Sequence, residues 1–276
     1  MRRQALVLTI LMLASIFSLG IQAVDTTIST PTSWASDDYV LDGNLTIASG
    51  STLTIDDLST VDAQTYSIIV EGVLIASNTT FFSSEQPVTQ GSQGQGMWSG
   101  IHVAQGGAVY LDDVQISNAE SALYVEGSAN LENLHLNHSY IGIHNDGGNV
   151  IASSVDAEVI DFDAIRNENL GLITLDTGIF SNVGIGVQNE GFATISNVEI
   201  HRAGIGFKGS SGELLLDQVG VINSTIGYVA NTGLMMRVNN SMTLDTTLSI
   251  DVGNAEDFEV HHGTFEGERF IFAAGS

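Results

Sequence analysis

Two series of polar and ionisable side chains recur through the middle of the sequence at intervals of 20 to 22 residues. The first series consists of His102, Tyr124, His144 and Arg166. The second lies two positions further along and consists of Ala104, Glu126, Asp146 and Glu168. If the intervals mark a structural repeat, imidazole, phenol, guanidinium and carboxylate groups converge on one face of the protein.

Stacked repeats would give this face the geometry of a glycosidase. Equivalent positions of neighbouring strands lie about 4.8 Å apart, so adjacent carboxylates would be about 5 Å apart and Glu126 and Glu168 about 10 Å apart. These values bracket the carboxylate separations of retaining and inverting glycoside hydrolases. Clustered like charges would raise the pKa of one carboxyl toward use as a general acid. In this catalytic interpretation the reacting groups are Glu126, His144, Asp146, Arg166 and Glu168.

Non-catalytic interpretations fit the same residues. The polar members of both series could bind a ligand, namely His102, Tyr124, Glu126, His144, Asp146, Arg166 and Glu168. The carboxylates of Glu126, Asp146 and Glu168 could instead hold Ca²⁺, which takes several oxygen ligands. The simplest alternative is a solvated face on which opposite charges pair.

An internal repeat would position these residues. Its register is a small residue, an apolar residue, any residue and a second apolar residue, as in Gly100-Ile101-His102-Val103. The first apolar members are Ile101, Leu123, Ile143, Ile165, Ile185, Ile205, Ile226 and Leu248, which span 147 residues in seven steps, a mean period of 21. Two further alternating segments follow in each period, such as Val109-x-Leu111 and Val114-x-Ile116. Period-2 alternation is typical of half-buried strands, so each repeat should contain three.

These repeats predict an all-β fold, a right-handed parallel β-helix with three short strands per coil of about 21 residues. One coil buries about six aliphatic side chains at about 2 kcal/mol each. Ordering its backbone costs about 1 to 2 kcal/mol per residue. A coil therefore depends on its neighbours for burial and for its ladder hydrogen bonds. Connections between parallel strands are almost always right-handed.

The segments "LTI", "GSTLTI", "IIVEGVLIA", "TFFSS" and "WSGIHV", between residues 45 and 103, carry a family resemblance. They resemble the opening of right-handed β-helix repeat proteins in the pectin-lyase-like superfamily. The resemblance covers about residues 40–265 and implies the fold. Members include polysaccharide lyases, hydrolases, adhesins and proteins of no known activity. The polygalacturonase set of paired Asp together with Gly-His-Asp and Arg-Ile-Lys is absent from the sequence, so the resemblance implies no particular activity.

The predicted organisation is a signal peptide at 1–23, an N-terminal cap at 24–39, a β-helix at 40–265 and a C-terminal cap or truncated end at 266–276. Arg2 and Arg3 followed by an apolar stretch are typical of a secretory signal, and an uncleaved anchor is the alternative. A Gly- and Gln-rich run at 85–97 predicts a loop insertion. The location is therefore expected to be extracellular or at the cell surface, with no membrane insertion beyond the signal segment.

Charge narrows the range of partners. The chain has 32 acidic and 7 basic residues, a net charge of −25 that becomes −27 without the signal peptide, and no cysteine. Such a surface repels nucleic acid and anionic membranes, and self-repulsion favours an ion-rich medium. Ca²⁺ is the one cofactor that the residues suggest.

Three local patterns give further expectations. Asn145 and Asn167 fall at inward positions, where their amides would pair with each other or mark a fault in the register. A row of glycines would extend the His102 series as a flat outward strip for a sugar chain, namely Gly186, Gly206 and Gly227. The acidic segment Asp161-Phe162-Asp163 falls at a coil corner, which favours a solvated turn over a cation site.

Taken together, the sequence favours a non-catalytic, secreted or cell-surface β-helix scaffold that binds carbohydrate, such as a polysaccharide or cell-surface glycan, or another surface partner. The alternative is a polysaccharide lyase or glycoside hydrolase that works on the outward face of the first strand. Coils of nearly constant length, with one conspicuous insertion before Trp98, leave few loops to wall a catalytic cleft.

Overall fold

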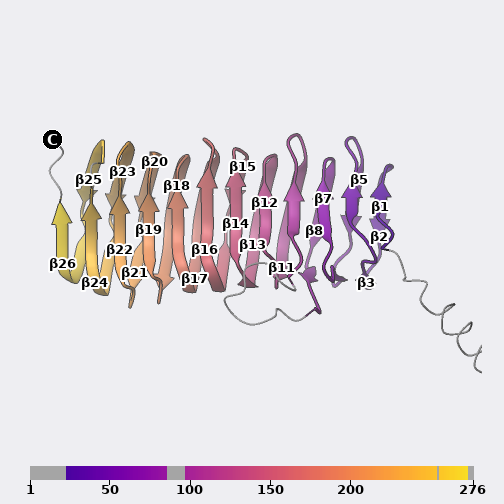
Figure 1. Ribbon diagram of the computed structural model, residues 1–276, viewed down its shortest axis with the longest axis horizontal. Helices are drawn as coiled ribbons and strands as arrows, with labels where there is room; N and C mark the ends of the chain where they lie inside the picture. The colour runs from indigo at the N-terminus through magenta and orange to yellow at the C-terminus, as the bar shows by residue number, and fades with distance from the viewer. Residues whose placement is uncertain (1–22, 86–96, 254, 273–276) are drawn as a thin grey trace, which may run out of the picture.

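The computed structural model describes residues 23–85, 97–253 and 255–272. These residues form a parallel β-solenoid of about 11 turns with about 21 residues per turn. Figure 1 shows the turns side by side along the long axis, from β1 (Thr26–Ile28) at one end to β26 (Thr264–Phe272) at the other. The predicted right-handed parallel β-helix is confirmed. The described residues form strands and turns but no helix, and hence no helical membrane span.

Each turn supplies strand segments to three parallel stacks. The first stack contains β1, β4 (Leu45–Ile47), β7 (Ser67–Val70), β10 (Gly100–Val103), β12 (Ser121–Val125), β14 (Ile141–Asp146), β19 (Ile205–Gly209) and β22 (Ile226–Ala230). The second contains β2 (Thr32–Trp34), β5 (Thr52–Ile55), β8 (Val73–Ser77), β15 (Asn149–Ala152), β20 (Gly212–Asp217), β23 (Leu234–Asn239) and β25 (Asp257–His261). The third contains β3 (Asp38–Val40), β6 (Thr60–Asp62), β9 (Thr80–Phe82) and β21 (Gly220–Ile222).

Other strands bend from one stack into the next. These longer strands are β11 (Ala108–Ser117), β13 (Ser128–Ser139), β16 (Val155–Glu168), β17 (Leu172–Asn189), β18 (Phe192–His201), β24 (Met242–Val252) and β26. At most turns, one left-handed residue bends the chain on each side of the third stack. In β11 and just after it these are Asp113 and Asn118, with φ of 53° and 58°. Asparagine tolerates this conformation better than most residues, and Asn118, Asn182 and Asn223 all adopt it.

The segment predicted as an N-terminal cap has the same three-strand structure as the other turns. Its strands β1, β2 and β3 pair in parallel with β4, β5 and β6. The predicted signal peptide lies outside the described residues except for Ala23. The predicted loop insertion lies outside them except for Glu85 and Met97.

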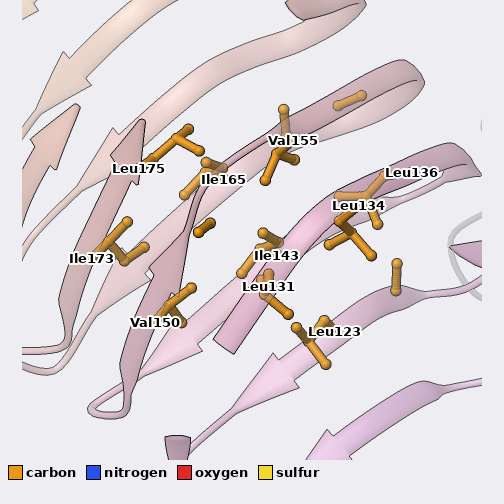
Figure 2. Packing of buried hydrophobic residues seen from close by; sticks show 14 of the residues in the cluster. Leu123, Leu131, Leu134, Leu136, Ile143, Val150, Val155, Ile165, Ile173 and Leu175 are labelled. Atoms are coloured by element: carbon orange, nitrogen blue, oxygen red, sulfur yellow. The ribbon is translucent and has the colours of Figure 1, made fainter. Parts of the chain in front are cut away.

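A single apolar core fills the interior of the coils. Figure 2 shows 14 of its side chains as sticks, and those that it labels come from all three stacks and include Leu123, Leu131 and Leu134. These three leucines are 0% exposed. Inward and outward residues alternate along each strand, as the period-2 pattern predicts. The outward residues of the first stack are therefore held on a rigid, closely packed support.

The first-stack register differs from the predicted one after Ile165. Ile165 pairs with Val187, whereas Ile185 pairs with Asp163 across a bulge in β16. The alignment of Ile165 with Ile185 was therefore wrong. Coil lengths vary by two residues and Ile185 and Val187 are both apolar, so sliding the alignment by two leaves the alternation intact. The observed inward column is Ile101, Leu123, Ile143, Ile165, Val187, Phe207, Tyr228 and Ile250.

This shift also corrects the position of the glycine row. Gly186, Gly206 and Gly227 face the core instead of forming an outward strip. A Cβ on Gly186 would lie 2.3 Å from Ile200 Cδ1, and one on Gly206 would lie 2.5 Å from Val221 Cγ2. The glycines leave room for large core side chains from the third stack and offer no surface to a sugar.

An internal ladder of amides lies beneath the first-stack face. Asn145, Asn167 and Asn189 are all 0% exposed. Asn145 Nδ2 donates to Asn167 Oδ1 at 2.8 Å, and Asn167 Nδ2 donates to Asn189 Oδ1 at 2.7 Å. The expected amide pairing is present and extends one turn further. The two-residue slip in the register places Asn189, rather than Val187, beside Asn167.

Candidate functional site

The first series of predicted site residues forms one outward column on β10, β12, β14 and β16. His102 pairs with Tyr124, Tyr124 with His144, and His144 with Arg166 in the parallel ladder. The observed register continues this column through Gln188 to Lys208 instead of through the glycines. The second series stands beside it, since Asp146 pairs with Glu168.

Three rings of this column pack edge to face. The centroids of His102 and Tyr124 are 4.8 Å apart at 85°, and those of Tyr124 and His144 are 4.9 Å apart at 83°. This edge-to-face arrangement is favourable for aromatic pairs. The ladder and the ring contacts together fix an aromatic row, defined as His102, Tyr124 and His144.

Each ring of the aromatic row also contacts a carboxylate of the following turn. His102 Nε2 lies 2.8 Å from Glu126 Oε2, and His144 Nε2 lies 3.0 Å from Glu168 Oε2. Between them, the Tyr124 hydroxyl donates to Asp146 Oδ2. The same diagonal contact is therefore made three times and joins six of the seven residues that the sequence pattern selects. The seventh, Arg166, lies 3.9 Å from Glu168 Oε1.

The contacts of Tyr124 and Asp146 shift the pKa of both groups. Hydrogen bonds from Tyr124 and then from Asn169 lower the pKa of Asp146, because they stabilise its charged form. Burial, with the bond to Asp146, raises the pKa of Tyr124. Asp146 is therefore held as a carboxylate and Tyr124 as a neutral donor. This arrangement disfavours Asp146 as a general acid.

Arg166 is held in place by Asp163, a residue that the sequence analysis assigned to a solvated coil corner. Its Nε donates to Asp163 Oδ2 at 2.6 Å and lies 3.9 Å from Glu168 Oε1. The Asp163 side chain is 0% exposed, so the expectation of a solvated turn was wrong for this residue. Burial raises the pKa of Asp163, while Arg166 opposes that rise. The guanidinium also lies over the Phe162 ring, 4.8 Å from its centroid.

A hollow of about 550 Å³ opens on this face. Its lining includes the aromatic row, Arg166 and the carboxylates Glu120 and Glu126. Several ring and polar groups thus meet at one concave surface, as in small-molecule sites. Tyr140, another lining residue, stacks on Phe162 at 5.5 Å and extends the aromatic surface toward Arg166.

The carboxylates of the second series are engaged by different partners rather than by one another. Glu126 contacts His102, Asp146 contacts Tyr124 and Asn169, and Glu168 contacts His144. Within the described ranges, no group of three or more His, Asp or Glu side chains is arranged to hold a metal ion. Calcium binding by Glu126, Asp146 and Glu168 stays a prediction.

Sequence reasoning missed Asp163, Asn169, Glu120 and Tyr140. Asn169 could have been found, because it lies three residues beyond Arg166 and therefore near the second series. Asp163 could not, because its position depends on the bulge in β16. Glu120 and Tyr140 could also have been found, because each lies four residues before a member of the first series, Tyr124 and His144 respectively.

Comparisons with known proteins give matches among solved structures alone. No protein-family model and no curated protein sequence matches the chain. Among solved structures, it is similar to the catalytic domain of a GH87 α-1,3-glucanase in complex with tetrasaccharides, at 9% identity and a TM-score of 0.48, over 87% of this chain and 63% of that one. It is similar to the periplasmic alginate epimerase AlgG at 8% identity and 0.45, over 88% and 76%. It is similar to the A-module of the Azotobacter vinelandii mannuronan C-5 epimerase AlgE6 at 12% identity and 0.46, over 92% of both chains. At these identities the similarity concerns the stacked-coil fold alone.

Proposed function

We propose that this chain is a secreted or cell-surface β-helix that binds a glycan along the outward face of the first stack. The observation that carries the proposal is the aromatic row, whose three rings line the hollow and are fixed by carboxylates of the following turn. Ring faces and edges suit the apolar C–H faces of sugars, and the flanking polar groups suit their hydroxyls.

Binding without catalysis agrees best with the state of the acidic groups. A hydrolase of the predicted type needs one carboxyl that keeps a proton near neutral pH. Hydrogen bonds from Tyr124 and Asn169 lower the pKa of Asp146, the central carboxylate of the second series, so it does not keep that proton. Burial raises the pKa of Asp163, but this carboxyl has no exposed surface with which to reach a ligand.

Affinity electrophoresis in gels that contain a soluble glycan tests the proposal. The panel comprises soluble starch, xylan, a soluble β-glucan and polygalacturonate. We expect at least one glycan to retard the parent protein, and Tyr124→Ala to weaken that retardation about tenfold, the effect of removing one ring from the binding face. The matched control is Tyr110→Ala, because Tyr110 is 49% exposed on the second stack, away from the hollow.

Two results would contradict the proposal. One is a parent that no glycan of the panel retards, and the other is equal weakening by Tyr124→Ala and Tyr110→Ala. The same samples are analysed for new reducing ends and unsaturated products. Products made by the parent and lost in Asp146→Ala would replace the binding function by the catalytic alternative.

A further inference from the structure

Asp163 occupies a position at which later turns carry an aliphatic side chain. In the ladder it pairs with Ile185, and the column continues through Ile205 and Ile226 to Leu248. An aliphatic residue would fill this place without the desolvation cost of a buried carboxylate. A buried ionisable group at such a position indicates a role beyond packing.

The role follows from what Asp163 does to Arg166. The ion pair at 2.6 Å and the Phe162 ring hold the guanidinium in one place, and the Arg166 side chain is only 17% exposed. Among the described residues, the two terminal nitrogens of Arg166 donate no hydrogen bond to the protein. The hollow is therefore lined by a fixed, planar guanidinium whose terminal N–H groups have no acceptor among the described residues.

The charge around these donors is already balanced. Asp163 contacts Arg166 directly, and Glu168 lies 3.9 Å from its Nε. Among the lining residues that the structure describes, Arg166 is the only Lys or Arg, whereas Glu120 and Glu126 add two carboxylates. The whole chain has a net charge of −25. A ligand carboxylate would accept hydrogen bonds from the Arg166 guanidinium, but it would also meet net repulsion from the surrounding carboxylates. Neutral hydroxyl groups would accept hydrogen bonds from the guanidinium without that repulsion.

We infer that the hollow takes an uncharged, hydroxyl-rich glycan and rejects polyuronates, and that Asp163 determines this preference by compensating the charge of Arg166. The inference rests on the proposed glycan-binding function and adds the ligand class to it. Asp163 acts through Arg166, since it has no surface from which to touch the glycan.

The test compares retardation by neutral glycans with retardation by polygalacturonate at about 10 mM salt, where the Debye length is about 30 Å. We expect a neutral glycan to retard the parent and polygalacturonate not to. Asp163→Asn keeps the shape and the acceptor for Arg166 Nε but removes the charge. We expect it to raise the ratio of polygalacturonate to neutral retardation about fivefold, as one uncompensated charge near the ligand would.

Asp161→Asn is the matched control. Asp161 lies on the same strand and is exposed, and its replacement by asparagine changes the net charge of the chain by the same amount as Asp163→Asn does. It should leave the ratio unchanged. Equal changes in Asp161→Asn and Asp163→Asn would overturn the inference, because they would trace the preference to overall charge.

If Asp163→Asn fails to fold, retardation of the parent and of Tyr124→Ala by the same glycans still tests the inference. If polygalacturonate retards the parent more strongly than every neutral glycan does, and Tyr124→Ala abolishes that retardation, the inference is overturned and glycan binding remains. A parent retarded by no glycan would overturn the proposed function and the inference with it.

Discussion

Replacing Arg166 by methionine tests whether the fold depends on the charge that Asp163 receives from it. The Asp163 side chain is 0% exposed, and its Oδ1 has no hydrogen-bond partner among the described residues. Methionine keeps an apolar stem but offers no donor, so the carboxylate would stay buried without its cation. Removing one partner of a buried pair costs about 3 to 5 kcal/mol. Because Arg166 keeps some exposure to solvent, we expect the lower end of that range.

The loss should depend on pH. Burial raises the pKa of Asp163 and Arg166 opposes the rise, so the variant moves the folded-state pKa further up. A carboxyl with a raised pKa binds protons more readily in the folded chain than in the unfolded one. Its favourable contribution to stability is therefore fully present below the unfolded pKa, about 3.9, and is lost as pH rises through the folded pKa. The penalty of Arg166→Met should be largest near neutral pH and smaller at about pH 5, by up to about 1.4 kcal/mol per pH unit.

Urea unfolding followed by circular dichroism measures this effect. With an m-value of about 3 kcal/mol per M, the midpoint of Arg166→Met should fall by about 1 M near neutral pH. Arg237→Met is the control, since Arg237 and Glu259 form a half-exposed ion pair at 2.7 Å, and its midpoint should not move. An unchanged midpoint in Arg166→Met near neutral pH, or an equal loss at both pH values, would refute the reasoning.

Three further predictions concern the scaffold. Gly206→Ala should cost about 1 to 3 kcal/mol in urea unfolding, because its Cβ would overlap Val221 at 2.5 Å. Gly220→Ala should be tolerated, since its nearest contacts lie at 3.7 Å or more. Asn167→Ala should cost about 3 kcal/mol by leaving buried amide groups unpaired, while alanine at the exposed Asn130 should change nothing measurable. Raising the NaCl concentration should raise the thermal midpoint, because screening relieves the self-repulsion of a strongly acidic chain.

The fold was predictable because its determinants repeat. A stack of three-strand coils is the simplest arrangement for three short alternating segments per 21 residues, and every turn repeats the same pattern. The register was less predictable. Its error between Ile165 and Val187 is a slip of two residues, the smallest that preserves the alternation of inward and outward positions. The sequence pattern therefore specifies whether a residue faces inward or outward more strongly than it specifies which residue of the neighbouring turn it pairs with.

For the candidate site, the positions of the residues were predictable from the sequence, but the contacts between their side chains were not. The column from His102 to Arg166 precedes the slip, so the structure brings these four residues together as the spacing predicts. The diagonal contacts between the aromatic row and the second series depend on side-chain direction, which spacing does not specify. Spacing predicted carboxylates grouped near one another, whereas the structure gives each its own aromatic partner.

The mistaken register and the missed residue have one cause. The bulge in β16 between Ile160 and Asp163 shifts the following turn, so Ile185 meets Asp163 instead of Ile165. The same bulge places Asp163 under Arg166, where a regular strand would have continued the aliphatic column. Bulges are common beside functional sites because they redirect single side chains without breaking the sheet. The point at which the repeat is least regular is therefore the point at which the protein departs from a plain scaffold, and the charge of Asp163 is the feature that this departure introduces.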